Sequence, residues 1–148
     1  MLLNVPKLLS PELLKAICEM GHGDKILLAD GNYPGKSAAA RCGAQFVRAD
    51  GLGVPALMEA ILTLMPLDLY TDLPAMVMDV DKRDKGMKIP IHDEYKAIVA
   101  KHDDRGADAV GHLERYAFYE KADECCVIVQ TGEEAVYANI ILQKGVIK

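Results

Sequence analysis

The sequence lacks an excess of basic charge, a long apolar run and any repeated or low-complexity segment. Its 17 lysine and arginine residues stand against 22 aspartate and glutamate residues, which gives a formal net charge of -5. Nucleic acids and anionic membranes are recognised through basic surfaces, so the charge argues against both as partners. Glu59 and Pro66 interrupt the most apolar region, and no stretch approaches the roughly 20 apolar residues of a membrane span.

The sequence also lacks the spacings of common metal and redox sites. The four cysteines show neither a single CxxC motif nor two CxxC motifs in succession. The four histidines form no HExxH pattern. Thiol chemistry at Cys125 and Cys126 is a weak alternative, because no histidine lies near them in the sequence and they open an apolar run. Residues 1–7 do not have the basic start and apolar core of a secretory signal. We therefore expect a cytoplasmic protein with reduced, buried thiols.

Short apolar segments alternate with segments of helical spacing along the whole chain. With 148 residues, 51% of them hydrophobic, the chain suits a single domain over residues 1–148. The alternation predicts an α/β domain with helices on both faces of a largely parallel sheet, a three-layer αβα arrangement. Helices are predicted from Pro11 up to Gly21 and over residues 37–41, 55–65, 90–102 and 114–124, and strands over 25–29, 44–49, 74–80, 125–130 and 135–142, with a solvated loop over 81–88.

The most informative local feature is a histidine between two glycines, His22, directly after the first predicted helix. Ser10 is suited to the N-cap of that helix, with Pro11 at its first position, and Gly21 is predicted to end it in a left-handed conformation. Glycines let the backbone approach a small ligand closely, and histidine has an unperturbed pKa near neutrality. The motif therefore suits proton chemistry, although a histidine in such a loop is more often a solvated turn residue.

Polar side chains that a core would not select occur at four further places. Arg115 and Tyr119 stand four apart on a predicted helix and so share a face. Tyr137 and Asn139 stand two apart on a predicted strand and also share a face. At the other two places, Asp30 ends one predicted strand, and Arg48 and Asp50 bracket the end of the next. Together they offer the carboxylate, amide, guanidinium and aromatic groups that bind a sugar, although each alone has an ordinary explanation as a cap, a surface ion pair or a half-buried aromatic.

Short strings in the same order along nearly the entire chain resemble the family of L-fucose mutarotases and D-ribose pyranases. They are SPELL at residues 10–14, EMGHGD at 19–24, LAD at 28–30, VRADG at 47–51, PLD at 66–68, ERYAFYE at 114–120, TGE at 131–133, YAN at 137–139 and KG at 144–145. The resemblance implies a small cytoplasmic enzyme that interconverts cyclic forms of a free monosaccharide without cofactor or metal. It also implies ring-shaped homodecamers with sites near subunit contacts.

The resemblance assigns a role to most of the polar residues. His22 corresponds to the family's proton donor, and its sugar-binding positions correspond to Asp30, Arg115, Tyr137 and Asn139. We add Tyr119, as a hydrogen-bonding or proton-relay group on the same helix face as Arg115. His22 precedes its strand and Asp30 ends it, so the two lie at opposite ends of that strand unless the loop folds back or another subunit contributes.

The substrate within the family is the less defined part. Arg115 in an Arg-x-Ala-Phe-Tyr-Glu string resembles the fucose branch, whereas the ribose branch carries a histidine near that position. Ala138 is more typical of the ribose branch. On the basis of the string around Arg115, we expect interconversion of the α and β anomers of L-fucose. The alternatives are D-ribose pyranose/furanose interconversion and a non-catalytic sugar-binding oligomer.

Overall fold

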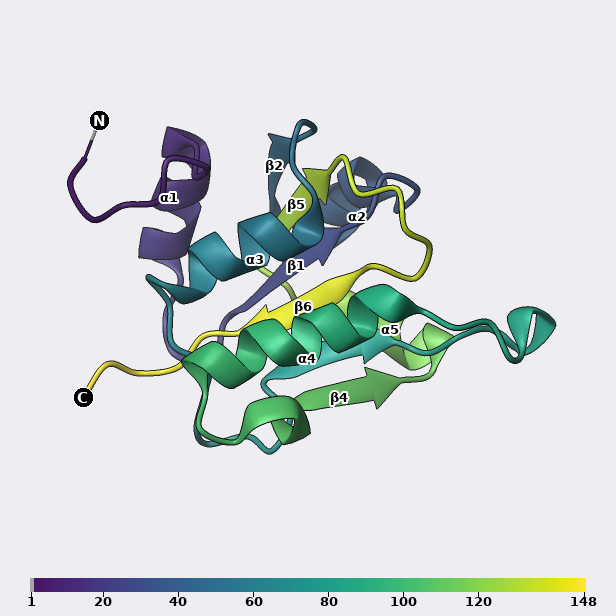
Figure 1. Ribbon diagram of the computed structural model, residues 1–148. Helices are drawn as coiled ribbons and strands as arrows, with labels where there is room; N and C mark the ends of the chain where they lie inside the picture. The colour runs from purple at the N-terminus through teal and green to yellow at the C-terminus, as the bar shows by residue number, and fades with distance from the viewer. Residues whose placement is uncertain (1) are drawn as a thin grey trace.

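The computed structural model describes residues 2–148, which form a mixed α/β domain (Figure 1). Its helices are α1 (Pro11–Glu19), α2 (Gly35–Cys42), α3 (Val54–Leu62), α4 (Pro90–His102) and α5 (Arg115–Ala122), with 3-10 turns η1 (Lys82–Asp84) and η2 (Gly106–Ala109). Its strands are β1 (Lys25–Ala29), β2 (Gln45–Ala49), β3 (Ala75–Met78), β4 (Val110–Leu113), β5 (Val127–Thr131) and β6 (Ile140–Gln143).

The six strands form one sheet in the order β2-β5-β1-β6-β3-β4. Strand β6 pairs antiparallel with both of its neighbours, β1 and β3, and the remaining pairings are parallel. Five strands therefore run in one direction, as the prediction of a largely parallel sheet requires. The start of β6 lies at the same edge as the carboxyl ends of the other strands, and this edge is called the carboxyl edge below.

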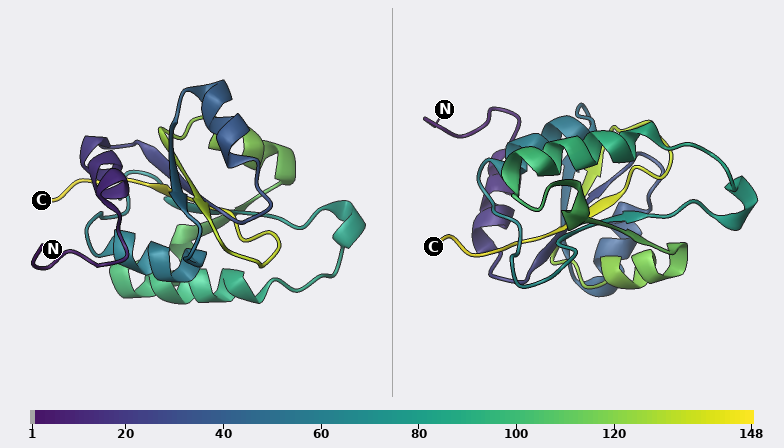
Figure 2. Two further views of the ribbon diagram at one scale, coloured as in Figure 1. Left: turned by 90° about the horizontal axis from the view of Figure 1, so that it is seen from above. Right: turned by 60° about the horizontal axis from the view of Figure 1, so that its bottom comes forward.

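Helices cover both faces of the sheet, which confirms the three-layer prediction (Figure 2). Side chains of α1, α3 and α4 pack with one set of alternating strand residues, including Ile26, Leu28 and Val77. Side chains of α2 and α5 pack on the opposite face with the intervening residues, including Leu27 and Met76. Strands buried on both faces explain why the sequence shows continuous apolar runs rather than alternation.

Local sequence signals fix the ends of several helices. The Ser10 hydroxyl accepts a hydrogen bond from the Leu13 N–H at 3.2 Å, which is the predicted cap of α1. Gly43 closes α2 with a φ of +75°, a conformation that glycine adopts without strain. Helix α4 spans the predicted residues 90–102, and Pro90 occupies its first position.

Four expectations about local structure are wrong. Gly21 is not left-handed; the positive φ lies at Gly23, because α1 ends earlier, in an extended Met20. Helix α3 ends at Leu62, short of the predicted residue 65. The last strand begins at Ile140 rather than 135, because Tyr137 has a φ of +57° that no strand accommodates.

The fourth error is the omission of β4. Gly111 and His112 break its apolar pattern, and the side chain of Leu73 packs over the position where Gly111 lacks a Cβ.

No helix among residues 2–148 is long and apolar enough to cross a membrane.

Candidate active site

A cavity of about 300 Å³ opens at the carboxyl edge of the sheet. It lies where β1 and β3 end, where β6 begins and where α5 follows β4. This is the edge at which open α/β sheets usually bind their ligands. The residues that line the cavity are Asp30, Asn32, Tyr33, Met78, Asp84, Arg115, Tyr119, Val136, Tyr137 and Asn139.

Asp30 and Asn139 form a reciprocal pair in the wall of the cavity. The Asn139 amide donates to Asp30 Oδ2 at 2.9 Å, and the Asp30 N–H donates to Asn139 Oδ1, also at 2.9 Å. Asp30 Oδ1 accepts the N–H groups of Asn32 and Tyr33, each at 3.0 Å. Burial raises the pKa of Asp30, and these bonds oppose that shift. A carboxylate has about four lone-pair directions, so Asp30 keeps capacity for one further donor, such as a sugar hydroxyl.

Arg115 and Tyr119 lie on the same side of α5, as their spacing predicts. The Arg115 guanidinium is 5.9 Å from the centre of the Tyr119 ring, and its Nη1 donates to Asp81 Oδ2 at 3.1 Å. The Arg83 N–H, Arg115 and the Arg83 side chain together lower the pKa of Asp81 to about 2. Asp81 therefore remains charged at neutral pH and holds one end of the guanidinium, while other N–H groups of Arg115 are available to a ligand.

Tyr137 and Asn139 both line the cavity, although the predicted reason is wrong. Tyr137 precedes the strand, and its left-handed backbone is held from α4: His92 Nε2 lies 2.8 Å from its carbonyl oxygen. The Tyr137 hydroxyl donates to Asp84 Oδ2 at 2.6 Å and accepts the Asp81 N–H at 3.2 Å. This bond to Asp84 raises the pKa of Tyr137. The charged 81–88 segment is exposed, as predicted, and contributes Asp84 to the lining of the cavity.

Sequence reasoning missed the other aromatic group of the cavity, Tyr33. Its ring stacks on that of Tyr119 with centroids 5.8 Å apart, and it is almost completely buried. The only local signal was its place in the turn that follows the Asp30 strand. Two other polar candidates, Arg48 and Asp50, pair with each other on the exposed end of β2 and do not line the cavity.

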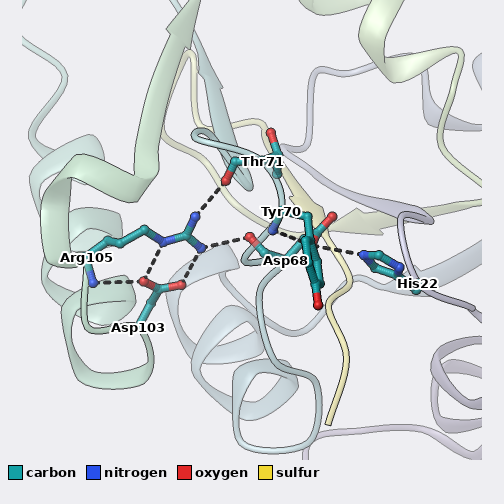
Figure 3. A network of polar contacts seen from close by, with 6 residues as sticks. All are labelled: His22, Asp68, Tyr70, Thr71, Asp103 and Arg105. Carbon is teal, nitrogen blue, oxygen red and sulfur yellow. Dashed lines mark hydrogen bonds and ion pairs between the residues drawn. The ribbon is translucent and has the colours of Figure 1, made fainter. Parts of the chain in front are cut away.

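His22 lies away from the cavity, at the opposite edge of the sheet. Its Nε2 is 3.0 Å from Asp68 Oδ1, and its ring lies against that of Tyr70 at a centroid distance of 5.4 Å (Figure 3). About half of the His22 side chain is exposed, 47%. The loop that carries His22 does not fold back over β1. Within one chain His22 and Asp30 therefore lie at opposite ends of β1, as the sequence predicts.

Within residues 2–148 no cluster of three or more histidine, cysteine, aspartate or glutamate residues is arranged to hold a metal ion. The fold and the cavity define a small α/β protein with a polar, aromatic-lined pocket suited to a hydroxyl-rich ligand. The chain belongs to the RbsD / FucU transport protein family, which it matches over residues 3–147.

Its relatives within that family are close. The fucose mutarotase of Homo sapiens is 48% identical over 146 residues, covering 97% of this chain and 93% of the relative. Among solved structures, FucU from Bifidobacterium longum superposes with a TM-score of 0.92 at 49% identity, covering 97% of this chain and 99% of the other. The fucose mutarotase from Streptococcus pneumoniae, solved in complex with L-fucose, gives a TM-score of 0.89 at 42% identity, covering 99% of this chain and 100% of the other.

Proposed function

We propose that residues 1–148 act as a single mutarotase domain that interconverts the α and β anomers of L-fucose. The observation that carries this proposal is the cavity in which the buried Asp30–Asn139 pair lies with Arg115 and three tyrosines. The relatives named fucose mutarotase support the same substrate. We assign hydroxyl binding to Asp30 and Asn139, oxygen orientation to Arg115, and hydrogen bonding to Tyr119 and Tyr137.

Anomer exchange requires the hemiacetal ring to open, the C1–C2 bond to rotate and the ring to close on the other carbonyl face. In the opening step the hydroxyl on C1 loses its proton and the C1–O5 bond breaks, with its electron pair going to O5, which gains a proton. One imidazole can accept the first proton and deliver it to O5, so no net proton is consumed. General acid–base catalysis of this kind accelerates a reaction by roughly 10² to 10⁴-fold. We assign this role to His22.

The proton carrier and the cavity lie at opposite edges of one chain, so the proposed site is shared between two copies. Strand β1 separates them, and its five residues span about 17 Å. Tyr70, whose ring contacts that of His22, is exposed, and so are the apolar side chains of Leu69, Val146 and Ile147. These side chains suit burial against a neighbouring copy. We propose that the chain forms the ring-shaped homodecamer typical of the family, in the cytoplasm, with the His22 edge of one copy against the cavity of the next.

D-ribose interconversion is the alternative within the family. The feature that favoured it, Ala138, is fully buried and does not line the cavity. Its carbonyl accepts the Tyr95 hydroxyl at 2.6 Å, so this position supports the backbone rather than the sugar. Arg115, which favours the fucose reading, does line the cavity.

The direct test is NMR exchange between the α and β anomeric protons of L-fucose, with and without the protein. We expect faster exchange with protein present, and faster for L-fucose than for D-ribose. Binding of L-fucose without faster exchange would indicate a non-catalytic sugar-binding oligomer. Faster exchange of D-ribose than of L-fucose would favour D-ribose pyranose/furanose interconversion. Light scattering on the same sample should give an assembly much larger than one chain, and should do so with chelator present and without reductant.

A further inference from the structure

The first two turns of α4 lie beside the segment that leads from β5 into β6, and two of their side chains hold its backbone (Figure 1). His92 Nε2 lies 2.8 Å from the carbonyl oxygen of Tyr137, and the Tyr95 hydroxyl donates to the carbonyl of Ala138 at 2.6 Å. His92 and Tyr95 stand three apart, so they share one face of the helix. Two consecutive carbonyls are therefore held by a single helix face.

Tyr137, whose carbonyl His92 holds, has an unusual backbone. Its φ of +57° is a left-handed conformation that residues with a side chain rarely adopt, and such conformations persist only where the surroundings hold them. A return to the ordinary helical φ, a rotation of about 120°, would turn the side chain in another direction. The hydroxyl would then lose its 2.6 Å bond to Asp84 Oδ2 at the cavity. The place of Tyr137 in the cavity therefore depends on what holds its carbonyl.

The imidazole of His92 is buried, and its proton has one possible place at this contact. Only 6% of the residue is exposed. A carbonyl oxygen can only accept, so Nε2 carries the proton and Nδ1 has the lone pair of the neutral ring. Burial lowers the pKa of His92, and the nearby His112 and Lys96 act in the same direction. The bond to the Tyr137 carbonyl and the carboxylate of Asp79 oppose that shift. The ring is therefore mostly neutral at pH 7 and above.

The packing around His92 keeps its ring in place. The rings of Tyr95 and His112 lie against it at centroid distances of 6.2 and 5.6 Å. His112 is held in turn by Asp79, whose Oδ1 lies 3.0 Å from its Nδ1. The imidazole thus presents Nε2–H to the carbonyl from a fixed position.

We propose that His92 is a positioning residue for sugar binding: its Nε2–H holds the Tyr137 carbonyl and thereby keeps the tyrosine hydroxyl in the cavity. His92 does not line the cavity, so it acts through Tyr137. Asn139, two residues further on, has its own support in Asp30, so loss of the His92 donor displaces Tyr137 rather than Asn139. The effect on the sugar rests on the proposed function, whereas the hydrogen bond and the place of Tyr137 are properties of the protein without sugar.

The first test compares two replacements of His92. The side-chain amide of His92→Gln can place a donor near the position of Nε2, whereas His92→Leu has similar bulk and no donor. We expect His92→Leu to weaken L-fucose binding about tenfold in titration calorimetry, the loss expected for one missing hydrogen bond, and His92→Gln to stay within about threefold of the parent. Equal losses in both variants, or parental affinity in His92→Leu, would overturn the proposal.

The matched control is His102→Leu, because His102 lies on the same helix and bonds Glu59 at 2.8 Å, away from the cavity. It should keep the parental affinity. A second comparison uses Tyr137→Phe, which lacks the hydroxyl that His92 places. Adding His92→Leu to that variant should weaken binding by less than about twofold more, because the effects of coupled residues do not add. Full additivity would show that His92 does not act through Tyr137.

NMR spectra test the geometry in the absence of sugar. In the parent near pH 8 we expect the Nε2–H form of His92 in the nitrogen-15 spectrum, assigned by comparison with His92→Gln. The ring signals of Tyr137 should shift in His92→Leu and stay in place in His102→Leu. An Nδ1–H form of His92 would overturn the proposal even if His92→Leu does not fold, and so would unshifted Tyr137 signals in a folded His92→Leu.

The same spectra separate this inference from the proposed function. A parent protein that neither binds L-fucose nor accelerates its anomer exchange would reject the proposed function and the role of His92 in sugar binding. The positioning of Tyr137 by His92 would still stand if the Nε2–H form and the Tyr137 shift are both observed.

Discussion

The two edges of the sheet differ in burial and in chemistry. At the carboxyl edge the buried Asp30–Asn139 pair and the partly exposed Arg115 and Tyr137 line a cavity. At the opposite edge a half-exposed His22 lies between the buried Asp68 carboxylate and the exposed ring of Tyr70. In the proposed mechanism, the groups at one edge hold the sugar and His22 at the other edge moves the proton. On those proposed roles neither edge would be sufficient alone, which is why we propose a site made by two copies.

The largest effect is expected when the proton carrier is removed. His22→Gln should lower the rate of L-fucose anomer exchange by about 100-fold or more, the contribution typical of a general acid–base group. The fold should survive, because His22 lies in a half-exposed loop. The measurement is the NMR exchange rate together with circular dichroism. His102→Gln is the control and should keep the parental rate; a folded His22→Gln with parental exchange would remove His22 from the mechanism.

Loss of the amide at the carboxyl edge should act on binding rather than on proton transfer. Asn139→Ala leaves the buried Asp30 N–H without its acceptor, and an unsatisfied buried group costs roughly 1 to 3 kcal/mol. We expect L-fucose affinity to fall about tenfold or more by titration calorimetry, and the melting temperature to fall with it. Unchanged affinity would show that the cavity is not where fucose binds.

Arg115→His tests whether Arg115 determines the preference for L-fucose over D-ribose. A guanidinium presents several donors in a rigid fork, and an imidazole cannot bond two neighbouring sugar oxygens in the same way. We expect the ratio of L-fucose to D-ribose exchange rates to fall by about tenfold, one hydrogen-bonding partner being worth roughly 1 to 3 kcal/mol. If the ratio does not move, Arg115 does not determine the sugar preference.

The smallest effect is expected for the ion pair of Asp103 with Arg105, whose guanidinium also donates to the carbonyls of Asp68 and Thr71 near His22. The hydrogen bonds from Arg105 lower the pKa of Asp103 below its ordinary value of 3.8. A carboxyl whose pKa is lower in the folded state stabilises the fold above pH 3.8, and this contribution is lost as the pH falls through the folded pKa. Asp103→Asn should therefore lower the free energy of unfolding by about 1 to 2 kcal/mol at pH 7, with the difference shrinking toward pH 3.

Urea unfolding across that pH range is the measurement for Asp103→Asn, with L-fucose affinity as a second readout that should not change. Asp123→Asn is the control, because it breaks an exposed ion pair with Arg41, and exposed pairs contribute about 0 to 1 kcal/mol. If Asp103→Asn lowered the free energy of unfolding by the same amount at every pH, the charge of Asp103 would not contribute to stability.

Much of this arrangement could be predicted from local sequence. Caps and prolines fixed the starts of α1 and α4, and the five expected sugar-binding side chains all line one cavity. The parts that were missed depend on contacts between distant segments. Tyr137 reaches the cavity through a left-handed backbone that α4 supports, and Asp68 is held by Gln143, 75 residues away. Periodicity reports neighbours along an element, so it cannot show such pairs.

The most direct test of a shared site is complementation between two inactive variants. Asp30→Asn disables the cavity and His22→Gln disables the proton carrier, and each variant alone should show little exchange. Co-expressed in equal amounts with different affinity tags and purified through both, they should regain exchange, because about one quarter of randomly paired sites combine an intact Asp30 with an intact His22. We predict about a quarter of the parental rate per site. Mixed assemblies with no more exchange than the two variants alone would contradict a site made by two copies.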